Sequence, residues 1–170
     1  MPYRIGTGFD IHRLAPGRRL ILAGLEIPYE KGLLGHSDGD VIVHAVADAI
    51  LGAAAQGDIG AWFPDTAKET KDMYSLDMLP RIMAKLGGTY IIANVDVNCM
   101  AEHPKLSPYR DAMRSRIAKA LGVEADQVSI KFRTHERLGE IGAGEAIAAQ
   151  AVVLLETKNN KSDVRSQESE

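Results

Sequence analysis

The stretch HSDGDVIVHAVADAILGAAA, residues 36–55, is strongly helical from about Asp38 onward, and it is apolar on almost every side. Ser37 or Asp38 could cap its first turn, because serine and aspartate side chains accept hydrogen bonds from the first backbone amides of a helix. A helix that is apolar all round is buried in a protein core. The sequence therefore predicts a buried helix in this segment.

Elements on either side of this helix alternate between strands and helices. Two strands are expected at 3–11 and 20–27, joined by a Pro-Gly turn. Farther along, the patterns predict a helix at 74–88, a strand at 89–101 with a polar face (Asn94, Asp96, Asn98), a helix at 107–123 with Ser107 as N-cap and Pro108 at its first position, a strand at 127–136 and a buried central strand at 145–156. This alternation predicts a single α/β or α+β layer sandwich.

Length and composition narrow the class of protein. The 170 residues fit one domain, expected at 1–157, and the polar segment 158–170 is predicted to be a disordered tail. The net charge of −3 argues against a nucleic-acid partner, whose binding surface would be basic. Cys99 is the only cysteine, which excludes disulfides within the chain. With no signal-peptide pattern and no membrane-spanning run, a cytoplasmic protein is expected, or a stromal one in a plastid-bearing source.

Five polar residues stand in positions that could form a metal site. Asp40, His44 and Asp48 are spaced i, i+4, i+8 and lie along one stripe of the apolar helix. In GTGFDIHRL, residues 6–14, Asp10 and His12 share a strand face at the expected end of the strand. Asp10, His12 and His44 would give one oxygen and two nitrogen ligands with one position open, as in catalytic zinc sites. An internal salt-bridged histidine, or a polar stripe facing solvent, explains the helix residues equally well.

Other polar positions are each open to a functional and a purely structural interpretation. His36 precedes the helix and could meet a phosphate there, or it is an ordinary exposed residue. The loop that joins Asp58 and Asp65 could close over a ligand or simply turn the chain. Lys105, between two prolines, could present backbone groups to a ligand or belong to a plain connection.

A further pair lies near the end of the strand at 127–136. Thr134 and Glu136 are expected on one strand face, with Lys131, Arg133 and His135 on the other. A carboxylate beside a hydroxyl could hold Mg²⁺ against phosphate oxygens. A solvated strand end is the alternative.

Several longer motifs match one known family. They are GFDIHRL, IPYEKGLLGHSDGDVIVHAVADAILGAAAQGDIG, FPDT, NVDVN, PKLSPY and THERLG, and the likeness runs from about Arg4 to Leu155. In these motifs the chain resembles the 2-C-methyl-D-erythritol 2,4-cyclodiphosphate synthase family. The block from Ile27 to Gly60 is too long and specific to match by chance.

The resemblance implies an enzyme of non-mevalonate isoprenoid (terpenoid) biosynthesis, a phosphorus–oxygen lyase. In that reaction, the 2-phosphate of 4-diphosphocytidyl-2-C-methyl-D-erythritol 2-phosphate attacks the β-phosphorus of the diphosphate. A cyclic diphosphate closes and CMP leaves. The implied fold is one mixed β-sheet with helices packed on one face. It is expected to assemble as a homotrimer whose sheets face the central axis and whose active sites lie between subunits.

The resemblance also implies residue roles. Asp10, His12 and His44 would bind zinc, and Glu136 would help hold a second divalent ion, magnesium or manganese. His36 and Thr134 match positions that steady the transition state. The implied substrate contacts are Ser37, Asp48, Asp58, Ile59, Gly60, Phe63, Pro64, Asp65, Thr66, Ala101, Pro104, Lys105, Leu106, Ser107, Arg133 and His135.

Two other functions stay open at this point. One is a non-catalytic metal- or nucleotide-binding module on the same trimeric scaffold, against which the presence of His36, Lys105, Thr134 and Glu136 argues. The other is a zinc hydrolase that uses a metal-bound hydroxide, with Asp40 or Asp48 as a general base. Glu140, Ala143 and the run RTHE depart from the commonest bacterial pattern, but none of them touches the expected zinc ligands.

Overall fold

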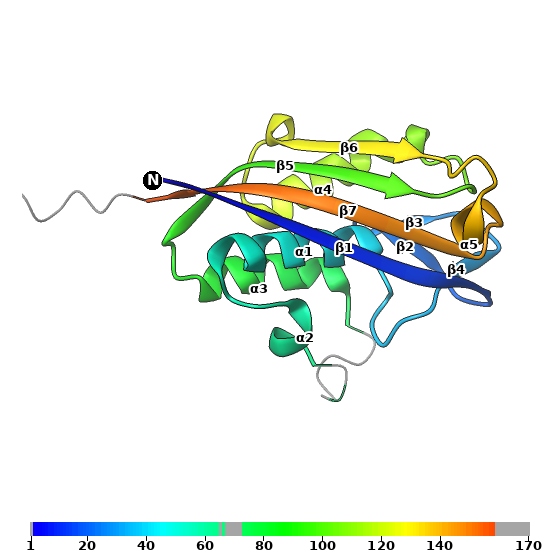
Figure 1. The fold of residues 1–170 in the computed structure, drawn as a ribbon, viewed down its shortest axis with the longest axis horizontal. Helices are drawn as coiled ribbons and strands as arrows, with labels where there is room; N and C mark the ends of the chain where they lie inside the picture. Colours follow the sequence, from blue (N-terminus) through cyan, green and yellow to red (C-terminus); the bar gives the residue numbers. More distant parts are fainter. Residues whose placement is uncertain (1, 65, 67–72, 159–170) are drawn as a thin grey trace, which may run out of the picture.

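A computed structural model describes residues 2–64, 66 and 73–158. Its main layer is a five-stranded mixed sheet in the order β4-β1-β7-β5-β6 (Figure 1). The strands are β1 (Tyr3–Pro16), β4 (Lys31–Leu33), β5 (Tyr90–Met100), β6 (Val128–Arg133) and β7 (Ala146–Thr157). Only β5 and β6 pair in parallel, while the other neighbours are antiparallel. This layer confirms the prediction of a mixed sheet with β7 at its centre.

Most helices form the second layer, on one face of this sheet, but a four-residue helix packs against Met100 and Ala148 on the other face, which corrects the expectation that helices cover one face alone. The α-helices are α1 (Val41–Ala54), α2 (Ile59–Trp62), α3 (Met78–Lys85), α4 (Arg110–Leu121) and α5 (Gly139–Gly142). Short 3₁₀ turns, Ser75–Asp77, Ser107–Tyr109 and Ala125–Gln127, precede α3, α4 and β6. As predicted, α1 is buried nearly all round, between the sheet and α3. None of the helices among the described residues is long and apolar enough to cross a membrane.

Two predicted boundaries near the N-terminus are wrong. The segment expected as one strand at 20–27 is a hairpin of β2 (Leu20–Leu22) and β3 (Leu25–Ile27) in a separate sheet. The chain turns at Ala23 and Gly24, both at positive φ. The strand expected to end at residue 11 continues to Pro16, so Asp10 and His12 lie in the middle of β1 and not at its end.

Two predicted helix caps are also corrected. α1 begins later than expected, and its N-cap is Asp40, whose carboxylate accepts hydrogen bonds from the amides of Ile42 and Val43. Ser107 and Pro108 begin a 3₁₀ turn, after which α4 has Tyr109 as its N-cap.

Two glycines let α1 lie directly on β1. A Cβ atom at Gly6 would stand 2.0 Å from the carbonyl oxygen of Ala49, and one at Gly8 would stand 2.1 Å from that of Ala45. Only glycine allows a helix backbone and a strand backbone to approach so closely. Because side chains alternate along a strand, Asp10 and His12 follow these glycines on the same face, toward α1. The GTGFDIH motif thus sets the packing and directs two polar side chains at the helix.

Beyond α5, which packs on one end of it, the opposite face of the sheet is uncovered among the described residues of the single chain. Alternate residues of β1 leave large apolar side chains exposed there, with Ile5 at 72% and Phe9 at 56%. The predicted polar face of β5 lies on the same side, because Asp96 and Asn98 pair with exposed positions of β7. The tail predicted from residue 158 lies almost wholly outside the described residues.

Candidate active site

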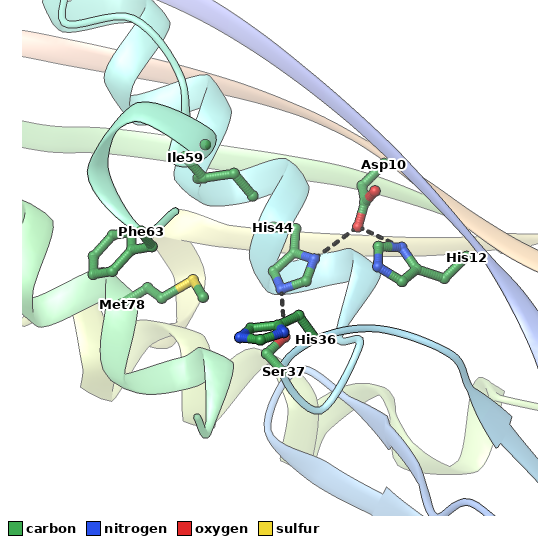
Figure 2. Close-up of a pocket in the computed structure, with 9 residues that line it drawn as sticks. Asp10, His12, His36, Ser37, His44, Ile59, Phe63 and Met78 are labelled. Atoms are coloured by element: carbon green, nitrogen blue, oxygen red, sulfur yellow. Dashed lines mark hydrogen bonds and ion pairs between the residues drawn. The ribbon is translucent and has the colours of Figure 1, made fainter. Parts of the chain in front are cut away.

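A pocket of about 360 Å³ lies beside the first half of α1 (Figure 2). It brings together residues from β1, the loop before α1, α1, α2 and α3: Asp10, His12, His36, Ser37, His44, Ile59, Gly60, Phe63 and Met78. Polar side chains gather at one end of the pocket, and Ile59, Phe63 and Met78 lie at the other (Figure 2). Such a lining suits a ligand with one charged and one less polar part.

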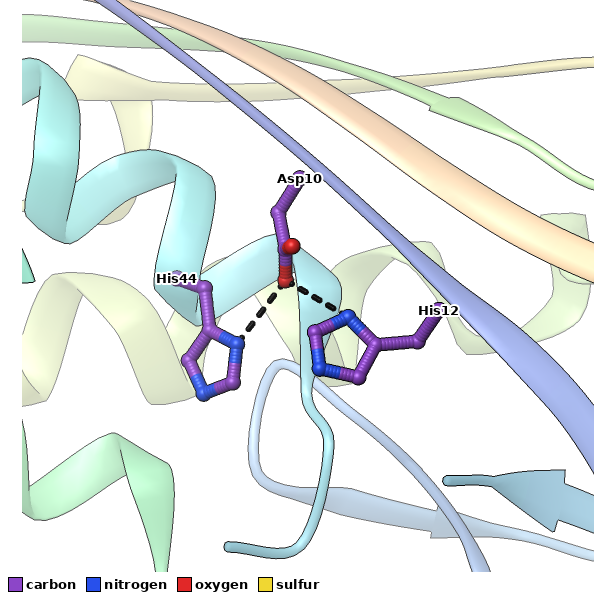
Figure 3. A group of neighbouring side chains, drawn as sticks. All are labelled: Asp10, His12 and His44. Carbon is purple, nitrogen blue, oxygen red and sulfur yellow. Dashed lines mark hydrogen bonds and ion pairs between the residues drawn. The ribbon is translucent and has the colours of Figure 1, made fainter. Parts of the chain in front are cut away.

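Asp10, His12 and His44 meet at the polar end (Figure 3). Oδ2 of Asp10 lies 2.8 Å from Nδ1 of His44 and 3.0 Å from Nδ1 of His12. One potential ligand atom from each residue lies within 4.8 Å of the other two. The structure therefore brings together the three residues that the sequence and the family resemblance selected.

The pKa values of Asp10 and His44 depend on each other's charge and on burial, which act in opposite directions. Burial alone would raise the pKa of Asp10, but the close contacts and positive charges of His12 and His44 outweigh it and lower this pKa to about 2. Burial opposes protonation of His44, whereas the hydrogen bond and charge of Asp10 favour it and raise the pKa of His44 overall. A carboxylate that stays ionised between two imidazoles is a natural cation ligand.

The donor set fits a divalent metal ion. One carboxylate oxygen and two imidazole nitrogens are the ligands of many catalytic zinc sites, which leave the fourth position for substrate. Nδ1 of His12 is buried, and among the described residues it has no partner in hydrogen-bonding geometry. A buried polar atom without a partner is costly, and a metal ion at the cluster would satisfy it.

Asp40 and Asp48, the two other polar residues spaced four apart from His44, each accept hydrogen bonds from backbone amides. Asp40 is fully buried, and besides capping α1 it accepts the amides of Ala23 and Gly24 from the β2–β3 hairpin. Burial raises the pKa of Asp40 to about 6. Asp48 accepts the amide of Ile59 at 2.8 Å, which fixes the start of α2 beside the pocket. Neither residue lines the pocket.

A second cluster forms where β5 and β6 end. The amide of Ala101 donates to the carbonyl of Arg133, and Glu102 accepts the amide of His135. Thr134 donates to Glu136 at 2.8 Å, but both residues lie beyond β6, and Glu136 has a φ of 50°. The expectation that they share a strand face is wrong, because the chain turns there, although the turn still brings the two side chains together.

The predicted substrate contacts divide between these two places. Among the described residues, those of 101–107 and 133–136 contribute nothing to the lining of the first pocket. Asp58 caps α2 through the amide of Ala61. Pro64 and Thr66 follow α2 and are exposed, and Asp65 lies outside the described residues.

Two residues that the sequence analysis did not select support the pocket. Arg18 donates to the carbonyls of Leu33 and Ser37, and so holds the loop that carries His36. Ser75 is fully buried and lies 3.0 Å from Nε2 of His44. Neither carries a sequence signal, because an arginine after a turn and a serine before a helix are ordinary residues in those places.

Comparison with known proteins places this chain in a family. The model of the YgbB family matches residues 3–156. The chain belongs to the YgbB family. A relative from Bacillus velezensis, named 2-C-methyl-D-erythritol 2,4-cyclodiphosphate synthase, is 53% identical over 91% of this chain and 98% of its own length. A relative of the same name from Geotalea uraniireducens is 52% identical over 91% of this chain and 99% of its own.

Solved structures agree with this placement. The chain superposes on "IspF (Plasmodium falciparum) CDP complex" with a TM-score of 0.79 and 38% identity, covering 92% of this chain and 97% of that one. A second structure, a 2C-methyl-D-erythritol-2,4-cyclodiphosphate synthase in a form with CDP bound, gives a TM-score of 0.83 at 38% identity, covering 90% and 100%. The YgbB fold of this chain is therefore the fold of these synthases.

Proposed function

We propose that this chain converts 4-diphosphocytidyl-2-C-methyl-D-erythritol 2-phosphate to 2-C-methyl-D-erythritol 2,4-cyclodiphosphate and releases CMP. Membership of the YgbB family and relatives of that name at over 50% identity support this activity. The single observation that carries it is the meeting of Asp10, His12 and His44 at the polar end of a pocket. The CDP complexes of similar structures support a cytidine nucleotide as the ligand class.

The reaction joins two phosphates of one substrate molecule. An oxygen of the 2-phosphate attacks the β-phosphorus, the bond from that phosphorus to the CMP oxygen breaks, and CMP leaves with the electron pair. No protein nucleophile is needed, so the protein contributes mainly orientation and charge stabilisation. This fits a pocket whose polar side chains are three imidazoles, a carboxylate and the hydroxyl of Ser37.

Zinc is the metal that we assign to Asp10, His12 and His44. When bound, it would supply Lewis acidity toward a phosphate oxygen. His36 is exposed at the mouth of the same pocket, where its ring can donate a hydrogen bond to a phosphate. Ile59 and Phe63 form the less polar end, suited to the methylerythritol carbons, and Asp58 and Gly60 lie beside it.

The cluster at the ends of β5 and β6 supplies the remaining roles. We assign Glu136 to a second divalent ion, Mg²⁺ or Mn²⁺, since its carboxylate is exposed and is oriented by Thr134. The loop 101–107, with Lys105 exposed on it, is assigned to the cytidine part through its backbone groups. We assign Arg133 and His135, which flank Thr134, to phosphate oxygens of the substrate.

A homotrimer with shared active sites accounts for the separation of these clusters. The zinc pocket of one subunit would face loop 101–107 and Glu136 of its neighbour. The uncovered sheet face supports assembly, because exposed residues as large as Ile5 and Phe9 on one face are typical of an interface. Asn94, Asp96 and Asn98, on the same face, would line a polar channel at the axis. We place the enzyme in the cytoplasm, where its nucleotide substrate would be found.

Incubation of the purified protein with the diphosphocytidyl substrate, followed by phosphorus NMR, tests the activity. Cyclic diphosphate together with CMP is the expected result. Free phosphate would instead indicate a hydrolase, and an unchanged substrate would indicate a binding module.

Two variants then separate metal binding from catalysis. His44→Ala should lose both zinc, measured by elemental analysis, and turnover. His36→Ala is the matched control, because it changes the same pocket outside the ligand set. It should keep zinc and lose turnover. Full zinc occupancy in His44→Ala would contradict the ligand assignment.

Mixed oligomers test the shared site. His44→Ala and Glu136→Ala chains should each be inactive. When equal amounts are unfolded and refolded together, about a quarter of the sites in a random cyclic trimer would combine an intact pocket with an intact Glu136. Recovery of activity in the mixture is expected. Its absence, with mixed trimers shown by native mass spectrometry, would refute the sharing of sites between subunits.

A further inference from the structure

We propose that Ser75 and Asp38 are positioning residues for His44, which fix the proton of its imidazole on Nε2 and leave Nδ1 free for a metal ion. This role rests on the metal site proposed above and specifies how the protein prepares one of its ligands. Ser75 and Asp38 come from different segments, 37 residues apart, and they meet behind the ring of His44, on the side away from Asp10.

The direction of the hydrogen bonds follows from counting protons. A serine hydroxyl has one proton to donate and two lone pairs to accept with. Ser75 donates its proton to Oδ1 of Asp38. Its oxygen can then only accept, and Nε2 of His44 lies 3.0 Å away. Nε2 must therefore carry a proton and donate it to Ser75.

The carboxylate of Asp38 is surrounded by donors that keep it in this role. Oδ2 accepts the backbone amide of Ser75 at 3.0 Å, and Oδ1 also accepts the amide of Asp40 at 3.3 Å. The amide of Asp38 in turn donates to the carbonyl of Met73 at 3.3 Å. These backbone bonds dock residues 73–75 against the loop before α1, so the orientation of Ser75 does not depend on one contact.

The hydroxyl of Ser37 accounts for the second lone pair of the Ser75 oxygen. Its oxygen lies 3.1 Å from that of Ser75 and accepts the amide of Gly39 at 3.3 Å. The proton of Ser37 can therefore fill the second lone pair of Ser75. Ser37 also lies 3.3 Å from Nε2 of His44, but among the described residues its hydroxyl makes no hydrogen bond to Asp38 that would fix its own direction. Ser75 is thus the hydroxyl that decides the tautomer.

The consequence appears on the other side of the ring. In a neutral imidazole with its proton on Nε2, Nδ1 presents a lone pair. That lone pair lies 2.8 Å from Oδ2 of Asp10, which is also an acceptor. Two acceptors at this distance repel each other unless a proton or a metal ion lies between them, so once the ring is neutral a metal ion can take the place of the proton that the imidazolium form shares with Asp10. The hydrogen-bonded chain Asp38–Ser75–His44–Asp10 therefore prepares Nδ1 and Oδ2 to share a metal ion, and outer partners of this kind orient metal-binding histidines.

The first test measures the proton directly. In protein labelled with ¹⁵N at histidine, ring nitrogen shifts distinguish a protonated from a bare or metal-bound nitrogen. With zinc bound, and in the metal-free protein at a pH where the ring is neutral, Nε2 of His44 should carry the proton. A proton on Nδ1 of the neutral metal-free ring would overturn the proposal. This measurement needs no substitution, so a variant that fails to fold does not affect it.

The second test uses zinc affinity, measured by competition with a chelator. Ser75→Ala should weaken zinc binding about 10- to 100-fold, the usual effect of losing such a partner. Asp38→Asn should weaken it at least as much, because a side-chain amide can donate to Ser75, whose hydroxyl then donates to Nε2 and moves the ring proton to Nδ1. Ser37→Ala is the matched control, a buried hydroxyl beside the same nitrogen, and should change affinity only slightly.

The outcomes separate this role from the activity. Zinc affinity in Ser75→Ala and Asp38→Asn equal to that of the unmodified chain would overturn the role of the pair. An equal loss in Ser37→Ala would also overturn it, because the effect would then belong to any buried hydroxyl. If the variants behave as expected but no cyclic product forms from the substrate, the proposed function fails while the positioning role stands.

Discussion

Replacement of Gly8 by alanine tests whether the close contact of α1 with β1 sets the metal site. The new Cβ would lie 2.1 Å from the carbonyl oxygen of Ala45 and 2.8 Å from the amide nitrogen of Ala49. Carbon contacts are comfortable at about 3.5 Å, so α1 must withdraw by about 1 Å or more. Both obstacles are backbone atoms, which cannot rotate away.

The expected cost follows from this displacement. Overpacking of a core usually costs about 1–3 kcal/mol, and a clash with backbone belongs at the upper end of that range. For a domain of this size, about 3 kcal/mol corresponds to a fall in Tm of roughly 6–12 °C. Zinc affinity should fall as well, because the 2.8 Å approach of Asp10 to His44 is set by the same packing.

Thermal unfolding and zinc titration at fixed protein concentration would measure both effects. Gly52→Ala is the matched control, since Gly52 is exposed on α1 and a Cβ there would lie 3.8 Å from its nearest neighbour, the oxygen of Thr7. Alanine is the better helix former, so this variant should gain about 0.5–1 kcal/mol and keep its zinc affinity. A Gly8→Ala protein with unchanged Tm and zinc affinity would refute the reasoning.

Three other perturbations have defined outcomes. Asp40→Ala removes the acceptor of four backbone amides and should lower the free energy of unfolding, measured with denaturant, by about 3 kcal/mol. Each buried unsatisfied donor costs about 1–3 kcal/mol, and relaxation of the structure recovers part of the loss. A loss under about 1 kcal/mol, within the range of an ordinary helix cap, would show that the hydrogen bonds to the β2–β3 hairpin contribute little. Ile5→Asp, on the uncovered sheet face, should shift the native mass spectrum from trimer to monomer. Lys119→Glu, on the exposed side of α4, is the control and should leave the trimer intact. An intact trimer of Ile5→Asp would show that this face is not part of the subunit interface. Burial raises the pKa of Asp96, but the hydrogen bonds from Lys131 and Ser129, together with the charge of Lys131, outweigh it and lower this pKa. The Lys131–Asp96 pair therefore stabilises the fold above the ordinary carboxyl pKa and loses this effect as the pH falls through the lowered pKa. Asp96→Asn should flatten the stability curve below about pH 4, and a curve of unchanged slope would contradict the pair.

Spacing in the sequence, together with the family resemblance, selected the three candidate metal ligands that the structure brings together. Period two placed Asp10 beside His12, and the apolar surroundings of His44 showed that it points into the core. The start of α1 could not be fixed in the same way, because Ser37, Asp38 and Asp40 are all good caps. Only the β2–β3 hairpin decides among them, since its turn at residues 23 and 24 needs the carboxylate of Asp40.

Other features depend on contacts between segments that are distant in sequence. Alternation placed Thr134 and Glu136 on a strand face, but the chain leaves the sheet after Arg133 and turns through positive φ at Glu136. A sequence pattern does not reveal such a turn when the residues are not glycine or asparagine. Ser75 was not predicted because its contact with His44 spans 31 residues. The spacing within one element predicts which residues share a face, whereas the meeting of two loops does not follow from either loop alone.

The central place of β7 has a consequence for how the chain folds as it is synthesised. The sheet order puts the last strand of the sequence between β1 and β5, and Tyr3 pairs with Glu156. Until residues 146–157 have left the ribosome, the inner edges of β1 and β5 have no partner, although the hairpin and α1 can already form from local contacts. Unpaired strand edges invite association with other chains. We expect the sheet to close only after translation is nearly complete, so slow release or premature termination before residue 146 would yield an aggregating product rather than a smaller folded one.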